Sequence, residues 1–433
     1  MVDRIVREPE YAEAVPGART GEVFVPSSKS QLHRLLICAA LGERPSEIAF
    51  KGLSEDIRAT ARCLNALGAV IEAEEAEAGG PGRLLVTPAD RSKPVRGAVL
   101  DCGESGTTLR FLLPLCGMLG ASCLVLRGGR LPERPLAPFD EQLRSHGMFL
   151  DEDGSRLTVS GALRSGEYAL PGNISSQFIS GLLMAFNGLT GQSRLQVEGR
   201  LESSKYISMT ESVLRLSGIR FAKDVTAEKT VWTMDGGQMP SLPEKTEAEG
   251  DWSAATFFLC LGALRERGVL VKGLDPESVQ PDRAALDVLK RVGAVVEHRE
   301  QGILVRRGDL KAVELDASQI PDAVPALAAL FSLCEGTTRI CRAERLRLKE
   351  SDRIKSTMHM LRSLGGIVTE TPDGLIIQGR PQLDGGTVNP AGDHRIAMAA
   401  AVAACGCKTP VRVLAPRCVG KSYPGFWDDL EQL

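Results

Sequence analysis

The sequence predicts an α/β (α+β) protein built from six repeated units, each running strand, helix, strand, helix, strand, strand. The first observation is a period: polar clusters precede apolar helix-like runs near residues 30, 106, 176, 252, 322 and 393, which lie 70 to 76 residues apart. Six such units, of about 72 residues each, account for the whole chain of 433 residues. The other two observations are the nearly uniform apolarity of the first helices and a glycine that ends most second helices.

The first helix of each unit is almost entirely apolar, as in the runs LLICAALG, FLLPLCGMLG, FFLCLGAL, VPALAALFSLC and IAMAAAVAAC. A helix that is apolar on all faces is buried. We therefore expect helices inside each domain and sheets outside. The polar residues that precede these runs mark helix starts, where free N–H groups and the helix dipole favour anions.

The second helix of five units ends in similar text, with a glycine suited to a left-handed C-cap and apolar residues that begin a strand. These glycines are Gly68, Gly147, Gly218, Gly293 and Gly365. Short alternating strands then follow, for example at 83–88, 156–161, 302–308 and 374–379.

Three units in each of two domains is the expected division, because one unit cannot bury its own core. The boundary is expected near the charged, proline-bearing stretch 241–250. This predicts an N-terminal domain at 21–246. The C-terminal domain is expected to combine 247–433 with 1–20, because the last unit is cut short and needs the first residues to complete it.

The composition is that of an ordinary globular protein, with 43% hydrophobic and 25% charged residues and a formal net charge of −3. This balance argues against a nucleic-acid partner. The charged N-terminus predicts no signal peptide, and no uncharged apolar run approaches the ~18 residues that suggest a membrane span. The eleven cysteines are scattered through apolar runs. We expect free buried thiols, a reducing cytoplasm and no metal site, since only Cys405 and Cys407 stand close together.

Nine polar motifs, most of them at expected helix starts, concentrate the residues that could carry chemistry. Read singly, each is compatible with simple helix capping or a solvated charged surface. Read together, they place seven cations at matching positions of different units, which predicts binding of small polyanions with phosphate and carboxylate groups. The motifs lie at 26–34, 103–110, 129–135, 173–178, 203–206, 320–323, 347–353, 393–395 and 421–424.

From about residue 20 to the C-terminus, these motifs, among them SKS, GESGTTLR, RLPERP, NISSQF, LKESDR, DHR and KSYP, resemble the 5-enolpyruvylshikimate-3-phosphate (EPSP) synthase family of enolpyruvyl transferases. The resemblance implies a two-domain inside-out α/β barrel with two crossovers and an active site in the interdomain cleft. It implies transfer of the enolpyruvyl group of phosphoenolpyruvate to the 5-hydroxyl of shikimate 3-phosphate, with release of phosphate. This step lies in the shikimate pathway to chorismate and aromatic amino acids.

The same resemblance implies no metal and no organic cofactor, small-molecule substrates, no nucleic-acid or membrane partner, a monomer, and a cytoplasmic location. It assigns shikimate 3-phosphate, mainly on the N-terminal domain, to Lys29, Ser30, Arg34, Ser175, Ser176, Gln177, Ser203, Tyr206, Asp322 and Lys349. It assigns phosphoenolpyruvate, mainly on the C-terminal domain, to Lys29, Gly106, Arg130, Gln177, Arg353, Arg395 and Lys421. The catalytic candidates are Asp322, Glu350 and Lys29.

The reaction needs a base near the 5-hydroxyl and an acid that protonates the methylene carbon and later takes the proton back. Glu350, flanked by Lys349 and Arg353, can move that proton, and Asp322 with Lys29 can handle the hydroxyl. The cations stabilise the carboxylate and the leaving phosphate, most strongly once domain closure excludes water.

The chain departs from the common family pattern at two positions, Glu104 and Arg345, where many members have Asn, so neither is assigned a role. Gly106 has no side chain to crowd the phosphoenolpyruvate pocket. We therefore expect glyphosate, which competes for that pocket, to bind.

Three other functions fit the sequence less well. The sister transferase acting on UDP-N-acetylglucosamine has Lys-Asn in place of Lys29–Ser30 and typically uses a loop cysteine, whereas Cys116 and Cys123 lie in apolar runs. RNA 3′-phosphate cyclases share part of the repeat but use a nucleotide-linked histidine, and His394 belongs instead to a charged triplet. A non-catalytic phosphate sensor would lack the two proton-transfer acids.

Overall fold

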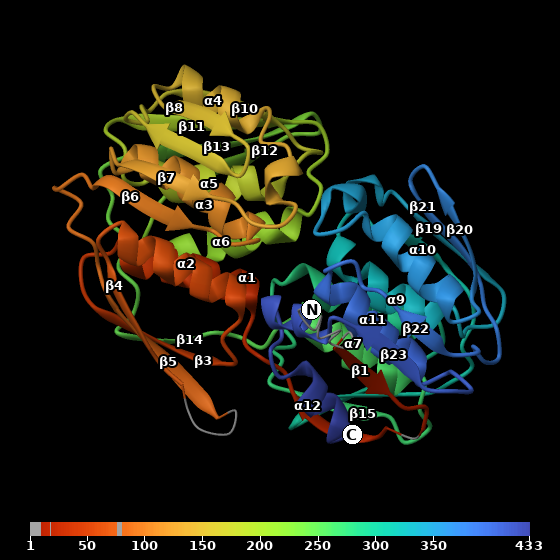
Figure 1. Ribbon diagram of the computed structural model, residues 1–433. Helices are drawn as coiled ribbons and strands as arrows, with labels where there is room; N and C mark the ends of the chain where they lie inside the picture. Colours follow the sequence, from red (N-terminus) through yellow and green to blue (C-terminus); the bar gives the residue numbers. More distant parts are fainter. Residues whose placement is uncertain (1–9, 18, 76–79) are drawn as a thin grey trace, which may run out of the picture. The chain divides into compact units, whose positions relative to one another are not determined.

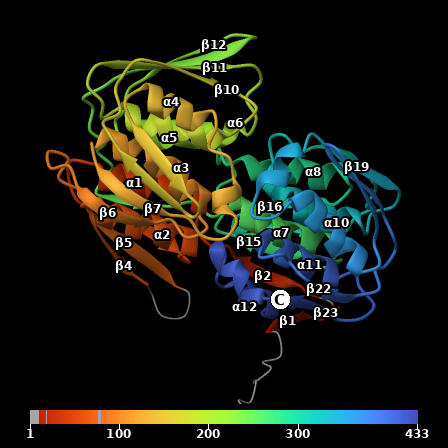
Figure 2. The same ribbon diagram turned by 45° about the horizontal axis from the view of Figure 1, so that its top comes forward.

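The computed structural model describes residues 10–17, 19–75 and 80–433 (Figures 1 and 2). Residues 1–9, which form most of the stretch expected to lack a signal peptide, lie outside the described residues. No helix in the described part of the chain is both long and apolar enough to cross a bilayer.

The chain forms two compact units. The N-terminal unit consists of Ser27–Glu249 with the short segment Val279–Pro281. The C-terminal unit consists of the chain up to Pro26 together with Gly250–Ser278 and Asp282–Leu433. Each unit therefore contains segments that are far apart in the sequence.

The N-terminal unit follows the predicted order of strands and helices. In chain order its elements are α1 (Lys29–Ala40), β3 (Ser46–Lys51), α2 (Glu55–Ala66), β4 (Val70–Glu74), β5 (Pro81–Thr87), β6 (Arg96–Asp101), α3 (Gly106–Met118), β7 (Ser122–Leu126), η2 (Leu131–Glu133), α4 (Phe139–Ser145), β8 (Phe149–Asp153), β9 (Arg156–Ser160), β10 (Glu167–Pro171), α5 (Ser176–Phe186), β11 (Gln192–Glu198), α6 (Ser204–Leu216), β12 (Ala222–Val225), β13 (Lys229–Asp235) and β14 (Lys245–Glu247).

The C-terminal unit repeats the pattern with several short 3-10 helices, labelled η. Its elements are β1 (Tyr11–Ala14), β2 (Gly21–Phe24), α7 (Trp252–Ala263), β15 (Val269–Lys272), η3 (Pro281–Ala284), α8 (Ala285–Arg291), β16 (Val295–Arg299), β17 (Gly302–Arg306), β18 (Glu314–Asp316), η4 (Pro321–Ala323), α9 (Val324–Phe331), β19 (Thr337–Cys341), η5 (Glu344–Leu348), α10 (Arg353–Ser363), β20 (Ile367–Thr371), β21 (Gly374–Gln378), β22 (Gly386–Val388), α11 (His394–Ala404), β23 (Val411–Leu414), η6 (Pro416–Lys421) and α12 (Phe426–Glu431).

In the described part of the chain the strands form six separate sheets, three in each unit, and this confirms the predicted α/β repeat. Five sheets have four strands with one topology, as in the order β6-β7-β9-β8, and the sixth has three strands, β1-β23-β22. In the repeated topology the first two strands are parallel and the others are antiparallel, as for β6 with β7 and β7 with β9. Among the described residues the sheets are not hydrogen-bonded to one another, so neither unit is a closed barrel.

Two strands belong to a different unit from the helices that follow them in the sequence. β2 precedes α1 of the N-terminal unit, but it pairs in parallel with β15 of the C-terminal unit. β14 precedes α7 of the C-terminal unit, but it pairs in parallel with β3 of the N-terminal unit. The chain thus changes unit after these strands rather than before them, and the expected boundaries at 20/21 and 246/247 lie a few residues earlier than the observed changes.

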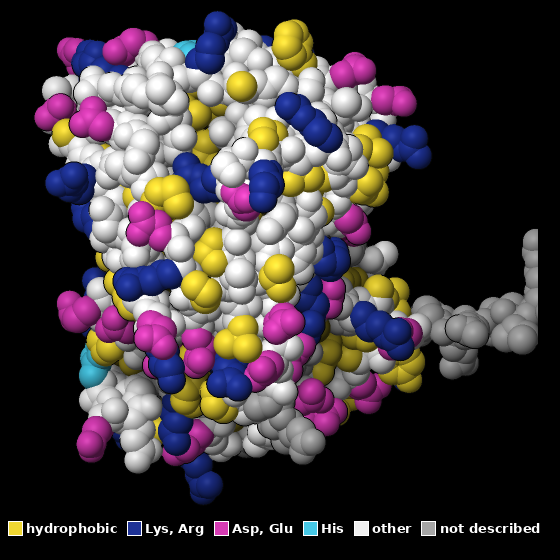
Figure 3. Space-filling view, turned by 90° about the vertical axis from the view of Figure 1, so that its left-hand side faces the viewer, with side chains coloured by type: hydrophobic (Ala, Val, Ile, Leu, Met, Phe, Trp, Pro, Cys, Tyr) yellow, Lys and Arg dark blue, Asp and Glu magenta, His cyan; other side chains and the backbone are white. Residues whose placement is uncertain are grey.

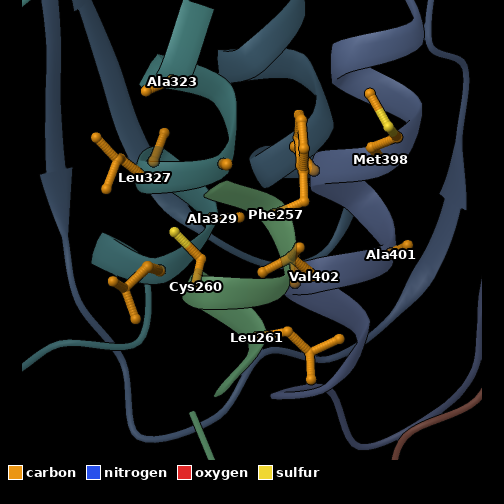
Figure 4. Close-up of a cluster of buried hydrophobic side chains, with 14 of the residues drawn as sticks. Phe257, Cys260, Leu261, Ala323, Leu327, Ala329, Met398, Ala401 and Val402 are labelled. Atoms are coloured by element: carbon orange, nitrogen blue, oxygen red, sulfur yellow. The ribbon is translucent and has the colours of Figure 1, made fainter. Parts of the chain in front are cut away.

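The first helices of the repeats form the core of each unit. In the N-terminal unit α1, α3 and α5 are buried over most of their length, and in the C-terminal unit α7, α9 and α11 are. Figure 4 shows Phe257 and Cys260 of α7, Leu327 of α9 and Val402 of α11 meeting in one apolar cluster. Burial of apolar surface stabilises a domain by roughly 25 cal/mol per Å², so these helices, with the inward-facing residues of the sheets, stabilise each unit.

The second helices and the sheets cover this core. On the face seen in Figure 3, basic and acidic side chains are interspersed and the apolar side chains are scattered. Three of the cysteines predicted to be buried free thiols, Cys38, Cys260 and Cys334, are free and buried.

Candidate active site

In the N-terminal unit, the first cation of the candidate site stands at the start of α1. Ser28 caps this helix, because its side chain accepts a hydrogen bond from the backbone N–H of Gln31. Lys29 is the first helical residue, and its Nζ lies 2.9 Å from Oδ2 of Asp56 at the start of α2. The ion pair joins the starts of α1 and α2.

The start of α3 brings two guanidinium groups together. Ser105 caps the helix and Gly106 is its first residue. A Cβ atom on Gly106 would lie 2.6 Å from Nη1 of Arg110 and 2.7 Å from Nη1 of Arg134, and both arginines are buried. Backbone N–H groups and two arginines at one helix start can hold an anion, and glycine leaves room for both guanidinium groups where they stand.

The structure separates the two arginines of the 129–135 motif. Arg130, which the sequence prediction selected, has a side chain that is 41% exposed and pairs with Glu133 at 3.0 Å. Arg134, four residues later, is the one that lies against Gly106. The sequence holds no signal that distinguishes these two arginines. The sequence prediction also did not include Arg110 among the site residues, although its position four residues after Gly106 puts it on the same helix face.

The starts of α5 and α6 carry the neutral residues of the candidate site. Ser175 caps α5 by accepting from the N–H of Gln177, and Nε2 of Gln177 donates to Thr107 Oγ1 at 2.8 Å, which links the starts of α5 and α3. Ser176 is buried beside them. Ser203 precedes α6 in the left-handed region, at φ 54°. Strain of this kind in a non-glycine residue is uncommon and collects at functional sites.

Arg34 is placed differently from the other predicted cations. It is buried, and its Nε, Nη1 and Nη2 donate to Thr210 Oγ1, the carbonyl of Ser30 and the carbonyl of Tyr206. Burial lowers the pKa of Arg34 to about 10. Its guanidinium group therefore joins α1 to α6 and holds the backbone of two other predicted site residues.

In the C-terminal unit, Arg353 is the centre of the candidate site. It is the first residue of α10 and is 1% exposed. Its Nη1 donates to Asp322 Oδ1 at 2.8 Å, its Nη2 to Glu350 Oε2 at 2.6 Å, and its Nε to Asp393 Oδ2 at 2.8 Å. Burial lowers the pKa of Arg353, but the carboxylates of Asp393, Glu350 and Asp322 outweigh it and raise the pKa above its usual value.

Asp322 is surrounded by cations. In addition to Arg353, Lys349 Nζ lies 3.5 Å from its Oδ1, Arg395 Nη2 lies 3.4 Å from its Oδ2, and Arg395 Nη1 donates to its carbonyl. Burial raises the pKa of this carboxyl, but Arg395, Lys349 and Arg353 more than offset burial and hold it well below its usual range. Asp322 is therefore ionised at neutral pH.

Two further ionisable groups stand near Asp322. Burial lowers the pKa of Lys349 to about 8, against the opposing effect of Asp322. Burial and the charge of Asp322 raise the pKa of Asp282 to about 6, against the opposing effect of Arg395. Asp282 was not recognised in the sequence, because it lies in none of the polar motifs at the starts of the buried helices.

The remaining predicted positions are also accounted for. Asp393 caps α11 by accepting from the N–H of Arg395, and Lys421 ends η6 and is partly buried. Asp251, the one helix tip without an expected ligand, caps α7 by accepting from the N–H of Ala254 at 2.9 Å. Glu104 is exposed just before the cap of α3. Within residues 10–17, 19–75 and 80–433, no group of three or more His, Cys, Asp or Glu side chains is arranged to hold a metal ion.

The structure thus brings Asp322, Lys349, Glu350, Arg353 and Arg395 into one hydrogen-bonded cluster. In the other unit it brings Gly106 together with two arginines, and Lys29 to Asp56. Buried cations at the helix starts of repeated α/β units are typical of proteins that bind small anionic ligands.

Comparison with known proteins identifies the family. The family model for EPSP synthase (3-phosphoshikimate 1-carboxyvinyltransferase) matches residues 15–430. The chain is 38% identical over 426 residues to the 3-phosphoshikimate 1-carboxyvinyltransferase of Clostridium kluyveri, which covers 98% of this chain and 97% of that protein. It is 39% identical over 427 residues to the protein of the same name from Clostridium acetobutylicum, which covers 96% of each.

A solved structure of EPSP synthase from Acinetobacter baumannii is similar in fold, with a TM-score of 0.76 at 24% identity over 97% of each chain. The chain belongs to the EPSP synthase family. The family resemblance that the nine motifs indicated is confirmed.

Proposed function

We propose that this chain transfers the enolpyruvyl group of phosphoenolpyruvate to the 5-hydroxyl of shikimate 3-phosphate and releases phosphate. Family membership supports the reaction. The observation that carries the assignment of residues is the position of Arg353, which binds both predicted proton-transfer acids, Asp322 and Glu350, through its two terminal nitrogens. One rigid guanidinium group fixes the separation of the two acids.

The reaction has two stages, addition and elimination. In the addition stage, the 5-hydroxyl oxygen bonds to C2 of phosphoenolpyruvate and the hydroxyl proton leaves. The methylene carbon C3 gains a proton and becomes a methyl group. In elimination, the bond from C2 to the phosphate oxygen breaks and C3 gives up one proton, which restores the double bond. Each stage therefore needs one group that accepts a proton and one that donates it.

Asp322 is assigned the acceptance of the hydroxyl proton, because its carboxylate is ionised; the cations that keep it ionised also make it a weaker base than a free carboxylate. Lys349, at 3.5 Å, helps to hold the carboxylate and the substrate oxygen. Glu350 is assigned the proton that moves to and from C3. Lys29, fixed by Asp56, is assigned to the two substrates' anionic groups and to the hydroxyl.

The anionic groups of the substrates are assigned to the cations of both units. For phosphoenolpyruvate these are the start of α3 with Arg110 and Arg134 in the N-terminal unit, and Arg353, Arg395 and Lys421 in the C-terminal unit. Preorganised donors of this kind stabilise the charge that develops on the leaving phosphate. Arg130 stays a predicted contact, to be compared directly with Arg134.

Shikimate 3-phosphate is assigned to the helix starts that carry neutral donors. These residues are Ser30, Ser175, Ser176, Gln177, Ser203 and Tyr206. Arg34 holds the backbone of two of these residues in place, because it donates hydrogen bonds to the carbonyls of Ser30 and Tyr206. Action as a monomer in the cytoplasm also stays a prediction.

A phosphate-release assay tests the proposal. The purified chain is mixed with phosphoenolpyruvate and either shikimate 3-phosphate or UDP-N-acetylglucosamine, and inorganic phosphate is measured over time. We expect release only with shikimate 3-phosphate, and we expect mass spectrometry to find the enolpyruvyl ether. Release only with the sugar nucleotide, or with neither acceptor, would refute the proposed function.

A further inference from the structure

A chain of buried hydrogen bonds in the N-terminal unit is not used by the reaction described above. His33 Nδ1 of α1 lies 2.8 Å from Thr60 Oγ1 of α2, and Thr60 Oγ1 lies 2.7 Å from Thr108 Oγ1 of α3. Thr108 Oγ1 in turn lies 2.8 Å from Oγ of Ser105, the residue that caps α3. All four side chains are fully buried.

Counting protons leaves two self-consistent directions for this series of hydrogen bonds. Each hydroxyl has one proton to donate. If Thr108 donates to Ser105, then Thr60 donates to Thr108, and His33 donates from Nδ1 to Thr60. His33 Nε2 then carries only a lone pair, and it has no hydrogen-bond partner among the described residues.

In the opposite direction Nε2 of His33 carries the proton, and this buried N–H group has no acceptor among the described residues. In either direction the same three hydrogen bonds join the ring to the hydroxyls, so the connection between α1, α2 and α3 does not depend on the direction. Burial, with the charges of Lys29 and Arg34, holds the pKa of His33 well below its usual value, so the ring stays neutral.

This series of hydrogen bonds ends at the start of α3, in the candidate anion site. When Thr108 is the donor, Ser105 Oγ accepts both from Thr108 Oγ1 and from the backbone N–H of Thr108. Thr108 also lies within 3.4 Å of the carbonyl of Asp56, whose carboxylate holds Lys29. The same buried hydrogen bonds thus connect the start of α3, which begins at Gly106, with the start of α1.

We propose that His33 and Thr60 are positioning residues that align the starts of α1, α2 and α3 for binding of the anionic substrate. Apolar contacts allow helices to slide or rotate slightly, whereas directional hydrogen bonds in a dry core fix both movements. The backbone N–H groups at Gly106 and the ammonium group of Lys29 keep their relative positions through this chain. The proposal rests on the proposed function for the identity of the anion, phosphoenolpyruvate.

Thr60 offers a sharp test, because it is the middle of the chain. Thr60→Val keeps the shape but removes the hydroxyl, and Thr60→Ser keeps the hydroxyl. Thr256→Val is the matched control, since Thr256 is equally buried but donates only within its own helix, to the carbonyl of Trp252 at 2.8 Å. We expect Thr60→Val to raise KM for phosphoenolpyruvate about tenfold, equal to about 1.4 kcal/mol, with a smaller rise in KM for shikimate 3-phosphate, which depends on these hydrogen bonds only through Lys29.

Thr60→Ser and Thr256→Val are expected to keep KM for phosphoenolpyruvate near that of the wild-type chain, even where the melting temperature falls. Calorimetric titration of the same variants with phosphoenolpyruvate reads anion affinity independently of turnover. A wild-type chain that releases no phosphate speaks against the proposed function, and the titration still tests the hydrogen-bond chain. Equal affinity in Thr60→Val and Thr60→Ser overturns the positioning role, whatever the change in stability.

Discussion

Gly106→Ala is the substitution whose consequence the structure defines most closely. The added Cβ would lie 2.6 Å from Arg110 Nη1, 2.7 Å from Arg134 Nη1 and 2.9 Å from Arg134 Cζ. Ordinary contact begins at 3.4 Å, so the guanidinium groups have to recede by about 0.8 Å. Both are ends of flexible side chains, and the backbone can therefore stay in place.

The cost of Gly106→Ala is thus expected in ligand binding rather than in folding. A displacement near 1 Å of a positioning group costs up to about 100-fold. We expect KM for phosphoenolpyruvate to rise about 10- to 100-fold, KM for shikimate 3-phosphate to change little, and inhibition by glyphosate to weaken at least as much. The free energy of unfolding is expected to fall by less than about 1 kcal/mol.

Steady-state kinetics with each substrate varied in turn, together with urea unfolding, measure these quantities. Gly425→Ala serves as the control, because Gly425 has a φ of −84° and the nearest atom to its added Cβ is 3.9 Å away. An unchanged KM for phosphoenolpyruvate in Gly106→Ala, or an equal rise for both substrates, would refute the reasoning.

The other predictions concern single charged groups. Glu350→Gln should lower kcat about 100- to 10,000-fold with little loss of binding, measured beside Glu344→Gln as an exposed control; a loss below tenfold removes its role. Arg134→Met should raise KM for phosphoenolpyruvate about 10- to 100-fold, and a larger effect from Arg130→Met would reverse the assignment. Lys349 is charged below its pKa of about 8 and neutral above it, so kcat/KM for shikimate 3-phosphate should fall as pH rises through about 8, and Lys349→Arg should remove that fall. Arg353→Met leaves one buried and two partly buried carboxylates without their shared cation and should lower the free energy of unfolding by about 3–5 kcal/mol; unchanged urea unfolding contradicts this.

Much of the candidate site can be predicted because it stands at helix starts. The run from Ser28 to Arg34 reads as a cap followed by a buried helix, and the structure places the cap and Lys29 at that point. Local patterns of this kind depend on residues three or four positions apart, so they can be recognised in the sequence itself. The same holds for the repeat, whose buried helices recur at a fixed period.

Contacts between distant segments could not be predicted in this way. Arg130 and Arg134 have the same local surroundings in the sequence, and only packing of the loop after β7 against the start of α3 puts Arg134 beside Gly106. Arg34 donates to Thr210, which is 176 residues away, and this contact turns an expected ligand cation into a link between α1 and α6.

By itself, the sequence determined six repeats, buried first helices and the polar residues at their tips, because periodicity and capping are properties of neighbouring residues. The tertiary structure decided which side chains and strands contact one another. It made Arg353 the shared cation of Asp322, Glu350 and Asp393, it separated the sheets instead of closing a barrel, and it exchanged β2 and β14 between the units. These outcomes depend on which buried surfaces and charges can be satisfied together across the folded chain, and no short window of sequence contains that information.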